Sequence, residues 1–146
     1  MQVEIKIDES LKSPRLVIYT KEMTDEINAL VERLSGPQSQ SLLGFQGDEM
    51  QLLSPKEIIR IYSQQQKVMA ETESGLFTLR LRLYELEDRL SLSHFVRISQ
   101  SELVNFNHVR KLDLSYNGTI GIVFKNGGQS YVSRRYMPKI KEYLGI

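Results

Sequence analysis

The first 34 residues combine two strand-like stretches with one amphipathic stretch. Val3–Ile7 alternates apolar and polar residues, and Arg15–Thr20 is rich in β-branched and aromatic residues, so both are predicted strands. A helix is predicted to begin at Thr24 or Asp25 as N-cap, with an apolar face formed by Ile27, Leu30, Val31 and Leu34. Residues 1–34 are therefore expected to form a small ββα unit.

The next segment, residues 35–41 ("SGPQSQS"), is small, polar and interrupted by Gly36 and Pro37, which favours a linker. Beyond it the pattern changes to short strands with few helices, so residues 42–146 are predicted to form one mainly β domain. Helices are expected at "LYELEDRLS", where Leu83, Leu86 and Leu90 share a face, and at about Arg135–Leu144, where Tyr136, Ile140 and Leu144 do so. The predicted strands are Glu49–Leu53, Ile58–Ser63, Lys67–Thr72, Leu76–Arg80, Phe95–Ile98, Val109–Ser115, Thr119–Lys125 and Ser130–Val132.

Two Asn-Gly pairs flank the strand predicted at 119–125. Asn117-Gly118 and Asn126-Gly127 are strong hairpin signals, because type I′ turns need positive φ angles that Asn and Gly adopt at low cost. Gly128 follows the second pair, so that loop is expected to hold three residues and a bulge.

Composition is typical of a soluble globular protein, with 40% hydrophobic and 25% charged residues. The sequence has no run of about 18 apolar residues and no signal-peptide pattern, and we expect a cytoplasmic location. It has no cysteine, which excludes disulfides and thiol chemistry. The net charge is only +1, but residues 94–146 carry eight basic and three acidic side chains. A basic face is therefore possible on a nearly neutral chain.

Catalytic patterns are weak in this sequence. The two histidines, His94 and His108, lie fourteen residues apart and lack a metal-ligand spacing. The acids Glu85, Glu87 and Asp88 fall on the expected solvent side of a short helix, and no nucleophile is paired with a base. We expect no enzyme, no cofactor, no metal and no small-molecule substrate.

Polar residues instead gather in three predicted connections: Ser63–Lys67, Ser99–Asn107 and Ser133–Arg135. Gln and Asn side chains read adenine edges, Arg reads guanine edges and phosphates, and Ser holds phosphates. Exposed loops are also polar without any nucleic acid, so a protein-protein interaction module that sequesters or titrates a regulator remains an alternative.

The stretches "HFVRISQSELVNFNHVRKL" and "NGTIGIVFKNGGQSYVSRRYMPKIKEYL" resemble the LytTR DNA-binding domain of bacterial response regulators, and the resemblance extends from about Leu42 to the end. The matching positions are Phe95, Arg97, Ser101, Val104, Asn105, Gly127, Ser133, Arg134, Arg135 and Tyr136. The resemblance implies a compact β-sheet fold that inserts loops into successive major grooves of duplex DNA and bends it.

The same resemblance implies roles for particular side chains. Base reading falls on Gln66 with Lys67, on Gln100 and on Arg135, whereas Ser101, Tyr131, Ser133 and Arg134 would contact phosphates. Ser99 and Gln100 stand where many relatives have histidine and a basic or amide residue, which lowers the positive charge there.

Residues 1–41 are too short to hold a receiver domain, so the chain resembles stand-alone LytTR regulators. The resemblance implies a homodimer on repeated operator sites and control by another partner, often a membrane protein that inhibits the regulator. Residues 1–34 are then expected to serve dimerisation or partner docking.

Overall fold

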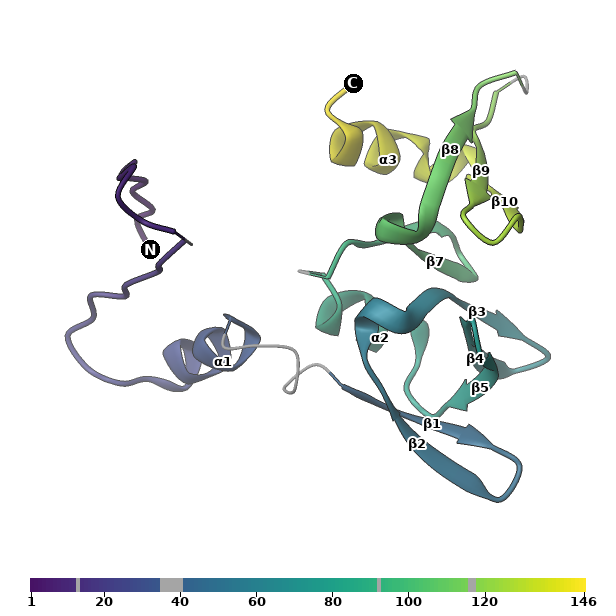
Figure 1. Cartoon of the computed structure of the whole chain (residues 1–146), viewed down its shortest axis with the longest axis horizontal. Coiled ribbons are helices and arrows are strands. Elements are labelled where there is room, and N and C mark those ends of the chain that lie inside the picture. The colour runs from purple at the N-terminus through teal and green to yellow at the C-terminus, as the bar shows by residue number, and fades with distance from the viewer. Residues whose placement is uncertain (13, 35–40, 92, 116–117) are drawn as a thin grey trace.

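The computed structural model describes residues 1–12, 14–34, 41–91, 93–115 and 118–146. Figure 1 shows a β-rich body, with residues 1–24 and the first helix extending to its left. Within the described residues, no helix is both long and apolar enough to cross a membrane. The predicted linker lies outside the described residues except for Ser41, so the division of the chain there stays a prediction.

The body is built on a seven-stranded antiparallel sheet in the order β2-β1-β5-β4-β3-β7-β6. A short 3-10 helix at Pro55–Glu57 leads into β3, and helix α2, Leu83–Arg89, connects β5 to β6. The strands are β1 (Leu42–Gln46), β2 (Glu49–Leu53), β3 (Ile58–Gln64), β4 (Lys67–Thr72), β5 (Gly75–Leu79), β6 (Phe95–Ser99) and β7 (Glu102–Asn105).

A second, three-stranded antiparallel sheet has the order β10-β9-β8. A 3-10 helix at Phe106–His108 joins the two sheets along the chain, and another at Arg134–Tyr136 leads from β10 into helix α3, Met137–Leu144. The strands of this sheet are β8 (Val109–Asp113), β9 (Gly121–Phe124) and β10 (Gln129–Tyr131).

Strands β3, β7 and β6, at one end of the large sheet, are buried on both faces. Neighbouring side chains of a strand point to opposite faces, and Ile58 and Ile59 on β3 belong to two different core clusters. One cluster lies between the sheet and α2, whose predicted face of Leu83, Leu86 and Leu90 is buried. The other lies between β3, β6 and β7, the small sheet and α3, where Ile140 is fully buried. The two sheets are thus held together by a shared apolar layer.

Most predicted elements of the body are confirmed, and β2 and β4 have the predicted bounds. Two strands, β1 and β7, were not predicted. In β1 the alternation of "LLGFQ" is interrupted by Gly44, and β7 is only four residues long. The structure also begins the last helix differently, because Arg134–Tyr136 form a 3-10 turn and the α-helix starts at Met137.

The two predicted N-terminal strands are wrong. No strand forms in the described part of residues 1–24, and Val3, Ile5 and Ile7 are almost fully exposed. An isolated two-stranded unit is at best marginally stable in water, and here no third strand or helix covers it. The predicted helix is confirmed as α1, Asp25–Leu34, and the Thr24 hydroxyl oxygen accepts a 3.2 Å hydrogen bond from the amide of Ile27 as an N-cap does.

The β9–β10 connection is the predicted three-residue loop with a bulge. The Phe124 amide donates to the Gly128 carbonyl at 2.9 Å, and the Gly127 amide donates to the Phe124 carbonyl at 2.9 Å. Within this loop, only Gly127 has a positive φ, of +91°. This is a type I turn followed by a left-handed glycine, which corrects the predicted type I′ turn. Asn117 of the other predicted pair lies outside the described residues.

Candidate nucleic-acid interface

The hairpin between β3 and β4 presents two glutamines in an unusual backbone conformation. Gln64 pairs with Lys67, so Gln65 and Gln66 alone form the turn. Both have positive φ, 52° and 66°. This is the two-residue geometry that Asn-Gly adopts easily and that a side chain with a Cβ adopts at a cost of about 1–2 kcal/mol per residue. The turn therefore holds the exposed Gln66 side chain, with Lys67 after it, in one defined backbone geometry.

The turn between β6 and β7 holds Gln100 and Ser101, and Arg97 fixes its backbone. Arg97 Nε donates to the Ser99 carbonyl at 2.9 Å, and Arg97 Nη2 donates to the Gln100 carbonyl. Arg97 is itself anchored by Glu87 of α2, with 3.5 Å between Nη1 and Oε1. The side chains of Gln100 and Ser101 are exposed.

The segment after β10 carries the remaining candidates. The Ser133 amide donates to the Ile98 carbonyl at 2.9 Å, which attaches this segment to β6. Arg134 lies against the backbone of Gly118, where an added Cβ would be 3.3 Å from Arg134 Nε. Gly118 has a φ of +75°, which a glycine adopts without strain. The missing side chain also leaves room for the guanidinium of Arg134.

Backbone hydrogen bonds bring these three segments to one edge of the molecule. The Ser63 amide donates to the Ser101 carbonyl at 2.9 Å, which joins the β3–β4 hairpin to the β6–β7 turn. The bond from Ser133 to Ile98 places the third segment beside the end of β6. In Figure 1 the β3–β4 hairpin projects at the right of the body. The segments around Ser63, Ser101 and Ser133 are thus linked in series, the first to the β6–β7 turn and the last to the end of β6.

The positive charges at this edge are not neutralised by carboxylates. Lys67, Arg134 and Arg135 are exposed, and in the described part of the chain none of them forms an ion pair. An ion pair between these arginines and an acid such as Glu142 would have given them a purely structural role, and no such pair is present among the described residues. The arginines remain available for an anionic partner.

Behind the edge lies a charged network that the sequence did not indicate. Arg60 Nε lies 2.7 Å from Glu71 Oε2, and Arg60 Nη1 lies 3.3 Å from Glu102 Oε2. Arg60 Nη1 also lies 3.3 Å from the hydroxyl of Ser130, on β10. Burial disfavours the Arg60 charge, but the hydrogen bond with Glu71 and the charge of Glu102 outweigh it, and the pKa of Arg60 is raised. The network links β3, β4, β7 and β10.

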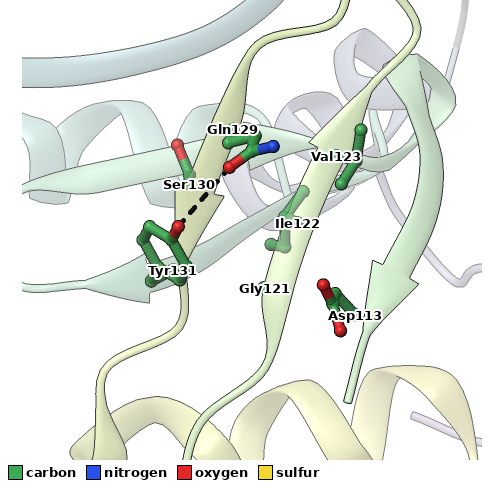
Figure 2. Close-up of a pocket in the computed structure, with 7 residues that line it drawn as sticks. All are labelled: Asp113, Gly121, Ile122, Val123, Gln129, Ser130 and Tyr131. Carbon is green, nitrogen blue, oxygen red and sulfur yellow. Dashed lines mark hydrogen bonds between the residues drawn. The ribbon is translucent and has the colours of Figure 1, made fainter. Parts of the chain in front are cut away.

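Tyr131 lies at the end of β10, beside a shallow hollow in the small sheet (Figure 2). Its hydroxyl donates to Gln129 Oε1 at 3.4 Å, because residues two apart on a strand share a face. The hollow has a cavity volume of about 10 Å³, room for one water molecule. It is too small for a small-molecule ligand.

The two histidines have structural contacts. His94 Nδ1 lies 3.4 Å from the hydroxyl of Tyr143, and His108 Nε2 lies 2.7 Å from the carbonyl of Lys56. Within the described residues, no group of three or more His, Cys, Asp or Glu side chains could hold a metal ion.

Comparison with known proteins identifies the family. The family model described as "LytTr DNA-binding domain" matches residues 48–145. The chain belongs to the LytTR DNA-binding domain family. The expected resemblance is thereby confirmed, and the match spans the strands β2 to β10.

Relatives and a solved structure agree with this assignment. Two proteins of Staphylococcus aureus, from strains NCTC 8325 / PS 47 and COL, are named uncharacterized HTH-type transcriptional regulators. Each is 33% identical to this chain over 147 residues, covering 100% of this chain and 99% of the relative. The fold resembles a LytTr DNA-binding domain of a putative methyl-accepting/DNA response regulator from Bacillus cereus. That match has a TM-score of 0.70 and 22% identity, and covers 73% of this chain and 97% of the other.

No helix-turn-helix is present among the described residues of this LytTR chain. Helices α1 and α2 are separated by five strands, and α2 and α3 by another five.

Proposed function

We propose that this protein is a sequence-specific regulator of transcription that binds duplex DNA through three segments. These are the β3–β4 turn, the β6–β7 turn and Ser133–Arg135, which together are called the interface edge. One observation carries the proposal: backbone hydrogen bonds link three segments that are distant in sequence, and these segments present exposed cations that form no ion pair within the described part of the chain. Membership of the LytTR DNA-binding family supports it. A regulator of this kind acts where the chromosome is, in the bacterial cytoplasm.

Base reading is assigned to the side chains that project from the turns. Arg135 has the fork geometry for the O6 and N7 acceptors of guanine, and Gln100 and Gln66 have amides suited to adenine. The loops enter successive major grooves, and Lys67 lies next to Gln66 to contact a base or a phosphate.

Phosphate contacts are assigned to residues whose position is fixed by the backbone. Ser101 and Ser133 each have a backbone hydrogen bond to a neighbouring segment, so their hydroxyls are held at the edge. Arg134 and Tyr131 extend from the same C-terminal segment. Such contacts set the orientation of the protein on the duplex without reading sequence.

Two copies are proposed to bind repeated operator sites, as expected from the resemblance. Control by a membrane-protein inhibitor stays a prediction. A protein-protein module is the competing function, and it would not need cations at a loop edge.

Selection of bound duplexes from a random DNA pool tests the proposal. We expect enrichment of one repeated motif, and an affinity that falls log-linearly with salt concentration, with a slope that reflects the phosphates contacted. A pool that shows no enrichment, together with salt-independent binding to a protein partner, would support the interaction module instead. The full-length chain and a chain lacking residues 1–41 should select the same half-site.

A further inference from the structure

The edge of the large sheet formed by β1 and β2 has one buried face and one open apolar face. Leu42 and Leu53 pair with each other and are buried in the core. On the opposite face, Leu43 pairs with Leu52 and Phe45 pairs with Met50. Leu52 is 69% exposed and Met50 is 66% exposed. Four large apolar side chains therefore lie together on a solvent-facing surface.

This open face forms one wall of a groove with basic residues along it. The groove has a cavity volume of about 390 Å³ and is lined by Leu43, Phe45, Leu52, Leu81, Arg80 and Arg89, among others. The Arg80 guanidinium stacks 4.1 Å from the centre of the Phe45 ring, so its charge lies directly over the apolar floor. Contiguous apolar surfaces with a polar rim are typical of protein-protein contacts.

Helix α1 has the complementary properties. It is amphipathic, yet none of its residues is buried. Ile27, Leu30, Val31 and Leu34 form its apolar stripe, and Asp25 and Glu26 give its first turn a negative charge. Its ten residues rise about 15 Å along the helix axis. The five residues of β1, which form one side of the groove, extend about 16 Å, a length similar to that of the helix.

The groove is not filled by α1 of the same chain, because no described residue of α1 is among those that line it. An ion pair between Arg33 and Asp88 of α2, with 3.3 Å between Nη2 and Oδ2, attaches α1 to the body. On α1, Ile27 and Leu30 are half-buried and Leu34 is exposed. The groove and part of the apolar stripe thus remain open within one chain.

We propose that α1 of a second copy lies in the β1–β2 groove, and that the two copies exchange their helices reciprocally. The apolar stripe of α1 packs on Leu43 and Leu52, and its acidic first turn faces Arg80 and Arg89. A reciprocal exchange closes with two-fold symmetry, because the same two surfaces are used on each copy. An amphipathic helix in an apolar groove is a recurrent mode of recognition.

This dimer surface is separate from the loops assigned to DNA. None of the groove residues named above belongs to the β3–β4 hairpin, the β6–β7 turn or the Ser133–Arg135 segment. Association can therefore be measured without DNA, and a failure of either proposal leaves the other intact.

The test is sedimentation equilibrium of the full chain without DNA, for three single variants and the unmodified protein. Leu52→Glu places a charge in the groove, and Leu30→Glu places one on the stripe of α1. Leu114→Glu is the matched control, because Leu114 is also 69% exposed but follows β8 on the small sheet. We expect the unmodified chain and the control to be dimers. Each test variant should have a dimer dissociation constant at least about 30-fold higher.

Mixing the two test variants distinguishes exchange between copies from docking within one chain. Leu30→Glu keeps an intact groove and Leu52→Glu keeps an intact helix, so an equimolar mixture regains one of the two contacts and forms a heterodimer more tightly than either variant forms a homodimer. The proposal is overturned by a monomeric unmodified chain, by variants that associate as well as the control, or by a mixture that behaves as the average of its components.

Discussion

The Ser130 hydroxyl donates a 2.6 Å hydrogen bond to Glu102 Oε2, and this bond joins the two sheets. Ser130 lies on β10 just before the segment with the two exposed arginines, and Glu102 begins β7 just after the turn with Gln100. Arg60 completes the network from β3. The relative position of two segments proposed to contact DNA thus depends on a part-buried polar contact as well as on the apolar layer between the sheets.

Replacement of Ser130 by Ala should lower the free energy of unfolding by about 2 kcal/mol, because a hydrogen bond to the half-buried carboxylate of Glu102 is lost. Urea denaturation measures this. Ser91→Ala, at an exposed position after α2, is the control and should change the free energy by less than about 0.5 kcal/mol. Equal effects of the two variants would mean that the bond between the sheets contributes nothing.

Asn105 is the buried amide that organises the turn before β3. Its Nδ2 donates to the carbonyls of Ile58 and Pro55, at 2.9 and 3.3 Å, and its Oδ1 accepts from the Asn107 amide at 3.0 Å. Asn105→Leu leaves these backbone groups without partners and should cost about 3 kcal/mol of stability, measured by urea denaturation.

Asn105→Asp makes the same site sensitive to pH. The new carboxylate would face two carbonyl oxygens in a buried position, so its folded-state pKa should lie above the unfolded value of about 3.9. The protonated acid can donate to a carbonyl and the carboxylate cannot. The variant should therefore lose stability as pH rises above about 4, relative to the unmodified chain. A parallel pH dependence of the two proteins in thermal unfolding would contradict this.

Two variants of the strained β3–β4 turn can distinguish an effect on protein stability from an effect on base reading. Gln65→Asn and Gln66→Gly each place a residue that tolerates positive φ, and each should raise stability by about 1 kcal/mol. Only Gln66→Gly removes a side chain assigned to a base, so only this variant should lose preference at one base position. The measurement pairs urea denaturation with binding to single-base operator variants. Loss of preference in both variants, or in neither, would remove Gln66 from the set of reading residues.

The sequence predicted most strands of the body because its hairpin signals are local. The bounds of β2 and β4 follow from alternation and adjacent turns. The predicted connection Ser99–Asn107 was too long, because its residues Glu102–Asn105 form the buried strand β7. The N-terminal strands failed because alternation shows that a strand could form, whereas a strand needs a partner edge and a covered face. The stretch Val3–Ile7 has neither.

The contacts that hold the proposed DNA-binding segments in place could not be predicted from local sequence patterns. Arg60 meets Glu102 and Ser130 across 42 and 70 residues of sequence, so no local pattern relates them. Arg97 was singled out through the family resemblance, but its role in holding the Gln100 carbonyl appears only when β6 and β7 form a hairpin. The positive φ angles of Gln65 and Gln66 were equally invisible, because glutamine is not a residue that favours such a turn.

The central claim is that the interface edge reads DNA sequence. It assigns different roles to two adjacent arginines, a phosphate contact to Arg134 and base reading to Arg135. Arg134→Ala should weaken binding to all duplexes alike and reduce the salt slope by about one unit, as expected for a lost phosphate contact. Arg135→Ala should cost about 1–3 kcal/mol on the preferred site and relax the preference at a single base position. Arg135→Lys should restore charge without restoring the preference, because lysine lacks the bidentate fork.

The most direct measurement is therefore the affinity of the unmodified chain, Arg134→Ala and Arg135→Ala for every single-base variant of the selected operator, with melting curves for each protein. The account predicts three folded proteins, a uniform loss for Arg134→Ala, and for Arg135→Ala a loss confined to the duplexes that retain one particular guanine. Equal and sequence-independent losses from both variants would contradict a reading role for Arg135, and unchanged binding by both would contradict DNA recognition at this edge.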